Sequence, residues 1–265
     1  MLQRNFFIGA ATFVVALACT VESADAQTCA TLPDYAKLKA ALIQATKDEG
    51  SGLNNHMWGT IVDRDGVVCA VAFSGKDRFA QWPGSRVISA QKANTANAFG
   101  LDSGSNSDNS GQANGLALST ANLFSAVQPG GSLYGLQFSN PVNEDAGYKT
   151  PSSLYGTATD PMKGSKIGGV NVFGGGLALF AAGKKMVGGI GVSGDTSCAD
   201  HFIAWRVRKN LGLDHLGGVG GVSGDKERPD NIVFDIGANN MSTGGFGHPK
   251  CLMTGNEKTL PAVQP

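Results

Sequence analysis

A glycine-rich apolar stretch that runs directly into a helical pattern constrains the fold more than any other feature. It reads GGIGVSGDTSCADHFIAW over residues 188–205. Val and Ile between the glycines favour a strand, and the helical pattern continues to about Asn210, before Gly212. Ser197 and Asp200 have the spacing of a capping box, so we expect them to begin the helix. A strand and a helix joined this tightly must share one core.

Two catalytic or binding motifs match this stretch in part. Gly189, Gly191 and Gly194 spell G-x-G-x-x-G, but a dinucleotide site needs the strand to end at the first glycine, and here the strand pattern continues through it. A nucleophile elbow, G-x-S-x-G, would place Ser193 at its centre, but Asp195 stands where the last glycine belongs. We interpret the stretch as scaffold first. A second candidate role of the stretch is to bind a carboxylate at the N-terminus of its helix.

The first 26 residues have the pattern of a secretory signal peptide. Arg4 precedes an apolar run over 6–18, and an A-x-A cleavage pattern ends at Ala26. The run is shorter than the roughly 20 apolar residues that span a bilayer. We expect cleavage after Ala26 and a periplasmic or secreted chain, with a lipoprotein attached at Cys19 as the alternative. No later stretch is apolar enough to cross a membrane.

Four cysteines remain after cleavage, and export favours disulfides between them. They are Cys29, Cys69, Cys198 and Cys251. Four cysteines allow three connectivities. We pair Cys198 with Cys251, which would tie the tail to the helix, and Cys29 with Cys69. Four free thiols are the alternative. The absence of a C-x-x-C spacing leaves a zinc motif unsupported.

The remaining pattern predicts an α/β domain at 27–216 and a C-terminal extension at 217–265. Thr31 would cap a first helix that ends near Gly50, a hairpin spans 57–75 with its turn at Asp65-Gly66, and a second helix spans 85–99. Later strands are expected at 168–173, at 177–193 with a tight turn at Gly183-Lys184, and at 231–236. The irregular segment at about 100–166 is an insertion, either lying over the core or forming a mobile lid.

The charge balance excludes one class of partner. Lys and Arg together number 21, as do Asp and Glu, so the chain has no electrostatic footprint for nucleic acid. No two histidines are spaced as a metal pair on one face, which makes a dedicated transition-metal site unsupported.

Short motifs in a fixed order carry a family resemblance. They are Val62-Asp63 with Gly66, Lys92-Ala93, Gly168-Gly169-Val170, and the run 189–194 followed by Asp200. In these motifs the chain resembles the GlcG/HbpS-like haem-binding family, which also includes the C-terminal domain of PduO-type proteins. Asn171 stands where that family commonly has proline, and the segments 100–166 and after 216 have no counterpart in its short members.

The resemblance implies a profilin-like architecture, with an antiparallel sheet of about five strands and helices packed on it. It also implies a non-enzymatic protein that binds haem or a related small ligand and forms a homo-oligomer. His56 and His201 are our candidate axial ligands, His56 because it precedes the first strand and His201 because Asp200 could orient its ring. The candidate ligand-binding residues lie around the start of the last helix: Lys92, Ser193, Gly194, Asp195 and Asp200.

Two other functions stay open at this level. Ser193, Asp195, Asp200 and Lys92 could form the polar pocket of an enzyme that acts on a small oxygenated metabolite. Alternatively, the glycine-rich insertion and the tail could serve a structural role in assembly. The residues alone do not decide among the three.

Overall fold

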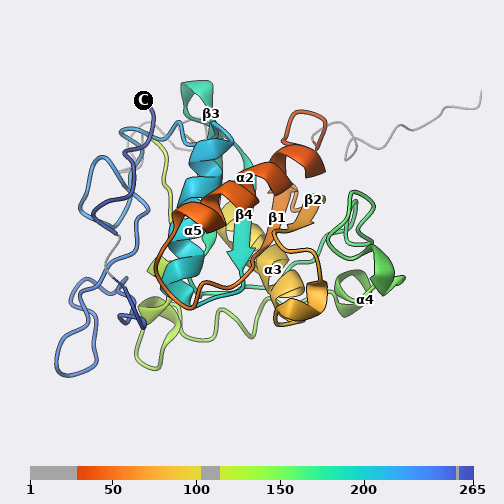
Figure 1. Ribbon diagram of the computed structural model, residues 1–265. Helices are drawn as coiled ribbons and strands as arrows, with labels where there is room; N and C mark the ends of the chain where they lie inside the picture. Colours follow the sequence, from red (N-terminus) through yellow and green to blue (C-terminus); the bar gives the residue numbers. More distant parts are fainter. Residues whose placement is uncertain (1–28, 103–113, 255–256) are drawn as a thin grey trace, which may run out of the picture.

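The computed structural model describes residues 29–102, 114–254 and 257–265. The predicted signal peptide, with its cleavage after Ala26 and the alternative anchor at Cys19, lies outside these residues. Within them, no helix combines the length and the apolar character needed to span a bilayer. The principal elements in chain order are α2 (Tyr35–Asp48), β1 (Trp58–Asp63), β2 (Val68–Phe73), α3 (Ser85–Ala98), β3 (Gly176–Ala181), β4 (Lys185–Ser193) and α5 (Ser197–Asn210) (Figure 1).

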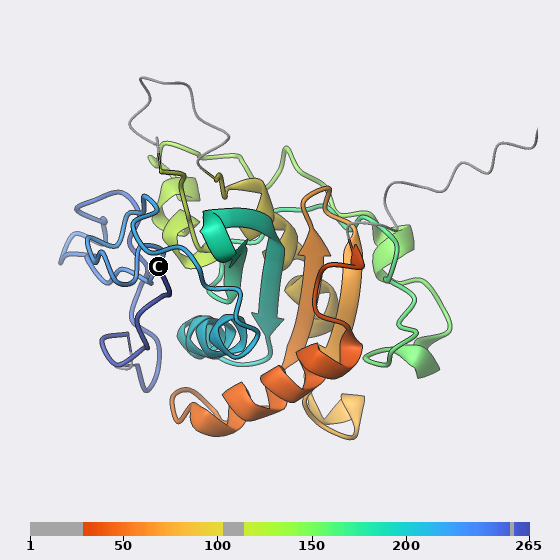
Figure 2. The same ribbon diagram turned by 90° about the horizontal axis from the view of Figure 1, so that it is seen from above.

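A four-stranded antiparallel sheet with helices on both faces forms the core, which confirms the α/β fold class. The strand order is β2-β1-β4-β3. α2 and α5 cover one face and α3 covers the other (Figure 2). Side chains alternate between the faces as strand geometry requires, since Ile61 packs with α2 and α5 whereas Val62 packs with α3. The predicted hairpin and the three long helices are all present.

The prediction of about five strands was wrong, because 168–173 and 231–236 do not join the sheet. Outside the named strands they make only isolated bridges, at Gly168 and at Ile236. Other segments already occupy the sheet edges. Val68 N donates to Ser165 O at 2.9 Å beside β2, and Phe180 N donates to Leu213 O at 2.8 Å beside β3. With both edges covered, no further strand can pair.

Glycines in β4 let helix α3 lie directly on the strand. Ile190 and Val192 face the core formed with α2 and α5, so the glycines between them face α3. A Cβ at Gly191 would lie 1.9 Å from Ser89 O, and one at Gly189 would lie 2.3 Å from Ala93 O. Any larger residue would force the helix away from the sheet. The interpretation of this stretch as scaffold is confirmed.

Part of the segment after α3 packs on the core, where Ala146 and Met162 are buried in the cluster that contains Val87 of α3. Whether the segment also moves as a lid stays a prediction. In its described part, 114–166, it forms turns and short helices, among them α4 (Glu144–Gly147) and three 3-10 turns at Thr120–Leu123, Ser125–Val127 and Ser152–Leu154. Arg86 on α3 holds it from inside: its Nε donates to Asp160 Oδ2 at 2.9 Å and its Nη1 donates to Gly147 O at 2.7 Å. Both members of the Arg86–Asp160 ion pair are buried.

The chain after residue 216 packs beside α5. Arg208 and Asp230 form a buried ion pair at 2.6 Å, and Trp205 Nε1 donates to Pro261 O at 3.0 Å. The domain limits at 27–216 and 217–265 stay predictions, since tight packing on α5 does not fix where one domain ends.

Both predicted disulfides are present, Cys29–Cys69 and Cys198–Cys251. The second one joins the tail to the first turn of α5, as expected. The predicted cap at Thr31 was wrong: Asp34 is the N-cap of α2, and its carboxylate accepts a hydrogen bond from Lys37 N at 2.9 Å. Asp is a better cap than Thr here because its negative charge is also stabilised by the partial positive charge at the helix N-terminus.

Candidate functional site

The first turn of α5 is capped differently from the sequence prediction. Thr196 is the N-cap, and its hydroxyl accepts a hydrogen bond from Ala199 N. Ser197 and Asp200 therefore do not form a capping box. The Asp200 carboxylate turns back toward the preceding loop, where it accepts from Gly194 N at 3.1 Å and Asp195 N at 2.8 Å. These contacts satisfy amides of the strand-to-helix turn that would otherwise be buried without partners.

Asp200 also forms a buried ion pair with Lys92 of α3. Lys92 Nζ lies 2.6 Å from Asp200 Oδ2 and 3.1 Å from Val192 O, and the two side chains are 1% and 4% exposed. Burial raises the pKa of Asp200 to about 6 and lowers the pKa of Lys92. Both directions follow from the cost of holding a charge away from water. The pair ties α3 to the start of α5 across β4.

Asp195 fastens a different segment. Its carboxylate accepts hydrogen bonds from Leu53 N at 2.8 Å and from Asn55 N at 3.0 Å, and the neighbouring Gly194 O accepts from Asn55 Nδ2. Ser193 is the last residue of β4 and is 5% exposed. The structure thus brings together the five residues predicted to bind a ligand, and the contacts described for them are to other residues of the chain. Their role in ligand binding stays a prediction.

The two candidate axial histidines lie in opposite environments. His201 is 0% exposed, and its Nε2 lies 3.1 Å from Ile232 N and 3.2 Å from Asn231 Oδ1. Burial lowers the pKa of His201 to about 4, so the ring is neutral at neutral pH. His56 is exposed, with its ring edge-on to Phe73 at 5.8 Å. A ligand from solvent reaches His56 directly but would reach His201 only if residues 231–232 moved.

A cleft of about 270 Å³ lies next to His56. Its charged and aromatic lining consists of three aromatic residues, three cations and one acid: Tyr35, Phe73, Tyr155, Lys39, Lys76, Arg78 and Asp77. His56 adjoins the rim through Gly75, where an added Cβ would lie 2.9 Å from the imidazole. Aromatic faces with several cations and one accessible imidazole suit a flat, anionic ligand. A larger cleft of about 790 Å³, between the start of α2 and the end of α5, contains none of the candidate residues.

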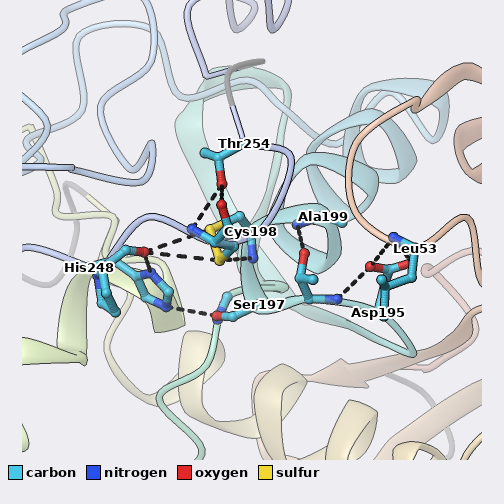
Figure 3. Close-up of a disulfide and its surroundings, with 11 residues drawn as sticks. Leu53, Asp195, Ser197, Cys198, Ala199, His248 and Thr254 are labelled. Atoms are coloured by element: carbon cyan, nitrogen blue, oxygen red, sulfur yellow. Dashed lines mark hydrogen bonds between the residues drawn. A yellow bond between two sulfur atoms is a disulfide. The ribbon is translucent and has the colours of Figure 1, made fainter.

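The sequence analysis missed one pair of side chains entirely. Ser197 Oγ lies 2.7 Å from His248 Nε2, and the two residues are 51 positions apart (Figure 3). His248 is 2% exposed, and Ser197 is half-buried. The only signal in the sequence was the predicted Cys198–Cys251 disulfide, which links the neighbour of Ser197 to a residue three positions after His248.

Comparison with known proteins places the chain. A family model described as haem degrading protein HbpS-like matches residues 34–209, more than half of the chain. This chain belongs to the HbpS-like family. No curated protein matches it.

Several solved structures are similar to this chain. One is the PduOC–haem complex, with 24% identity and a TM-score of 0.43, covering 68% of this chain and 93% of that one. Another is the Klebsiella pneumoniae protein ORFY, with 22% identity and a TM-score of 0.41, covering 78% and 97%. A double mutant of HbpS from Streptomyces reticuli has 18% identity and a TM-score of 0.40, covering 77% and 99%.

The HbpS-like match confirms the resemblance drawn from the short motifs, and the structure shows what the motif residues do. Asp63 ends β1, and its carboxylate accepts from Asp65 N and Val67 N within the hairpin turn. Lys92 and Ala93 lie on α3, where Ala93 lies against Gly189 and Gly191 of β4 and Lys92 lies against Gly176 of β3. The motifs that identify the family therefore serve mainly to pack α3 onto the two central strands.

Proposed function

We propose that this chain is an exported haem-binding protein that acts as a homo-oligomer. The observation that carries the proposal is the accessible His56 beside an aromatic, cationic cleft, in a chain that belongs to the HbpS-like family. His56 is the proposed axial ligand. We propose that one edge of the porphyrin binds in the cleft.

The donor set fits haem. In the part of the chain that the structure describes, neither ring nitrogen of His56 makes a side-chain hydrogen bond, so the imidazole is available to coordinate iron. Lys39, Lys76 and Arg78 outnumber the one acid of the cleft, Asp77, and supply positive charge for the two propionates. Tyr35 and Phe73 supply aromatic surface for the ring, whereas one face of Tyr155 is covered by the guanidinium of Arg86 at 3.6 Å. When bound, haem would supply iron and a redox-active macrocycle; the protein would supply orientation and charge neutralisation.

The size of the cleft supports the oligomer. Its volume, about 270 Å³, is below the roughly 300–1,000 Å³ of pockets that bury most of a drug-sized ligand. Haem would therefore keep much of its surface outside one protomer. Phe79 and Trp82, on the connection that follows the cleft residues, are 71% and 53% exposed. We propose that a second copy covers this apolar surface and the protruding part of the ligand.

A hemin titration of the mature protein tests the haem proposal. We expect a shift of the Soret band at about one haem per protomer in the wild type, and at least tenfold weaker binding in His56→Ala. His215→Ala is the matched control, since His215 is a partly exposed histidine distant in sequence from the cleft. No shift in the wild type would remove haem as the ligand. Loss in His201→Ala but not in His56→Ala would move the axial ligand to His201.

Export and assembly are measured on the same preparation. We expect the N-terminal residue of the protein recovered from the bacterial periplasm to be Gln27. We expect size-exclusion chromatography to give a mass at least twice that of the mature chain, and this mass should fall to the monomer value in a Phe79→Ser/Trp82→Ser variant.

The other two functions, an enzyme with Lys92, Ser193, Asp195 and Asp200 in its pocket and a structural role in assembly, are not supported by a specific observation. The residues that line the four clefts described between 29 and 265 do not include Lys92, Ser193, Asp195 or Asp200, so no described cleft supports the enzyme alternative. The tail packs on α5 through side chains and a disulfide.

A further inference from the structure

The Ser197–His248 pair has the geometry of a nucleophile and its general base. The Ser197 hydroxyl lies 2.7 Å from His248 Nε2. His248 Nδ1 lies 2.6 Å from Pro249 O, and a carbonyl can only accept a hydrogen bond. The proton of the neutral ring is therefore on Nδ1, which leaves Nε2 to accept the serine proton. The carbonyl of Pro249 takes the orienting place that a carboxylate has in a Ser-His-Asp triad.

Two features keep His248 in the basic, neutral form. Burial lowers the pKa of His248, so the ring is unprotonated at neutral pH. The ring is also clamped, because the ring of Phe124 lies 4.9 Å from it and the disulfide at Cys251 fixes the chain three residues later. A base held in one tautomer and one orientation is the arrangement that activates a serine.

One backbone amide donates to the serine oxygen. Gly174 N donates to Ser197 Oγ at 2.6 Å. Ser197 is also the first residue of α5, and the first amides of a helix lack an intrahelical acceptor and carry partial positive charge. Cys198 N donates to Cys251 Sγ and Ala199 N donates to the Thr196 hydroxyl, so the amide of Ser197 itself is the candidate donor to the oxyanion of a tetrahedral intermediate.

We propose that Ser197 and His248 form a nucleophilic site that cleaves small carboxylic esters, an activity separate from haem binding. Phe124, whose ring lies 4.9 Å from the His248 ring, also lines a cleft of about 200 Å³ together with Ser125 and Met241; Ser197 and His248 do not line that cleft. This site is not the partial nucleophile elbow around Ser193, which lies four residues before Ser197. No histidine side chain is among the contacts described for Ser193.

The reaction balances without any cofactor. Ser197 Oγ bonds to the ester carbon while its proton passes to His248 Nε2. The tetrahedral intermediate collapses, the carbon–oxygen bond to the alcohol breaks, and the alcohol leaves with the proton from His248. Water then attacks the acyl-serine, gives its proton to His248, and releases the carboxylic acid with the serine restored. The sum is ester plus water giving acid plus alcohol.

Active-site labelling of the folded mature protein tests the proposal. The probes are a fluorophosphonate, with the adduct located by mass spectrometry, and p-nitrophenyl acetate, with the release of nitrophenolate followed by its absorbance at about 400 nm. We expect one adduct per chain on Ser197, no adduct at this position in Ser197→Ala, and labelling at least tenfold slower in His248→Gln. The wild-type rate should rise with pH through a midpoint below the ordinary histidine value, and His248→Gln should lose that step.

Ser223→Ala is the matched control. Ser223 lies in the same sequence, GVSGD, as Ser193, but its hydroxyl donates to Arg228 O at 2.7 Å and not to a histidine. Its labelling and ester hydrolysis should equal those of the wild type. Absence of a Ser197 adduct on the wild-type protein would overturn the proposal, whether or not the variants fold. Hydrolysis that persists in Ser197→Ala at the wild-type rate would also overturn it.

Discussion

Two side-chain pairs meet the first turn of α5, and they differ in charge and in exposure. Lys92 and Asp200 are oppositely charged and sealed between α3, β4 and α5. Ser197 and His248 are neutral, and Ser197 is half-buried on the side where the tail packs. Residues three positions apart on one helix thus point into two different environments.

The difference shows that a fully buried charged pair contributes to stability, whereas a neutral, partly exposed pair can take part in a reaction. A charge without water needs an opposite charge and hydrogen bonds around it, and the Lys92–Asp200 pair has both. Such a pair has no free face for a substrate. Burying a neutral hydroxyl or imidazole costs far less than burying a charge, so these two groups do not need to be surrounded by partners. The imidazole therefore keeps the lone pair of Nε2 available to the serine.

Breaking the charged pair should produce the largest loss of stability. Lys92→Met leaves the Asp200 carboxylate buried without its cation, and we expect the free energy of unfolding to fall by about 3–5 kcal/mol. Chemical denaturation at pH 7 measures it. The matched control is Lys185→Met: Lys185 Nζ also lies 2.6 Å from a carboxylate, that of Asp102, but its side chain is 71% exposed. We expect that control to lose about 1 kcal/mol or less. Equal losses would mean that the Lys92 pair is not sealed from water.

The contributions of Asp200 and its neighbour His201 to stability should change in opposite directions as the pH falls. The folded pKa of Asp200 is about 6, above its ordinary value, so its contribution to stability is fully present below about pH 4 and is lost as the pH rises through 6. The folded pKa of His201 is about 4, below its ordinary value, so its contribution is present above about pH 6.5 and is lost as the pH falls to 4. Each change amounts to at most about 3 kcal/mol.

Two variants resolve these opposing effects. Between pH 6.5 and 4, the wild type should gain stability relative to Asp200→Asn and lose stability relative to His201→Gln. Denaturation curves at four or five pH values give both differences. A difference that does not vary with pH, for either variant, would show that the residue titrates alike in the folded and unfolded chain.

Removing the neutral pair should have the smallest effect on stability. Ser197→Ala deletes one hydroxyl that bonds to His248 and Gly174, and a neutral hydrogen bond contributes about 1 kcal/mol net. We expect a loss near that value, because water can reach the half-buried position and replace part of the contact. Thermal and chemical denaturation should agree. A loss as large as that of Lys92→Met would give Ser197 a mainly structural role.

The local pattern was sufficient for most of the secondary structure but not for strand pairing. The alternation of glycine with Ile190 and Val192 located β4, and the pattern after Ser197 located α5. Residues 231–236 have equally good strand composition, yet they form no ladder, because strand propensity acts only where a partner edge is free. The edge beside β3 is occupied by 213–215.

The sequence located the residues around the strand-to-helix turn but not their contacts. The family motifs include Lys92 and Asp200, and the four cysteines left three connectivities open. The sequence could not tell that the side chain of Asp200 turns back to the amides of Gly194 and Asp195 and leaves the helix cap to Thr196. Nor could it distinguish the accessible His56 from the buried His201, since both sit in mixed polar and apolar surroundings along the chain.

By itself, the sequence determined the three long helices, the strands of the sheet and the family of this protein, because these depend on spacing within short windows. The number of cysteines allowed two disulfides but left three connectivities open. Only the tertiary structure decided which polar groups meet. Lys92 and Asp200 are 108 positions apart, and Ser197 and His248 are 51 apart. Contacts over such distances depend on how α3, α5 and the tail pack around β4, and the close approach of α3 exists only because Gly189 and Gly191 carry no side chain there.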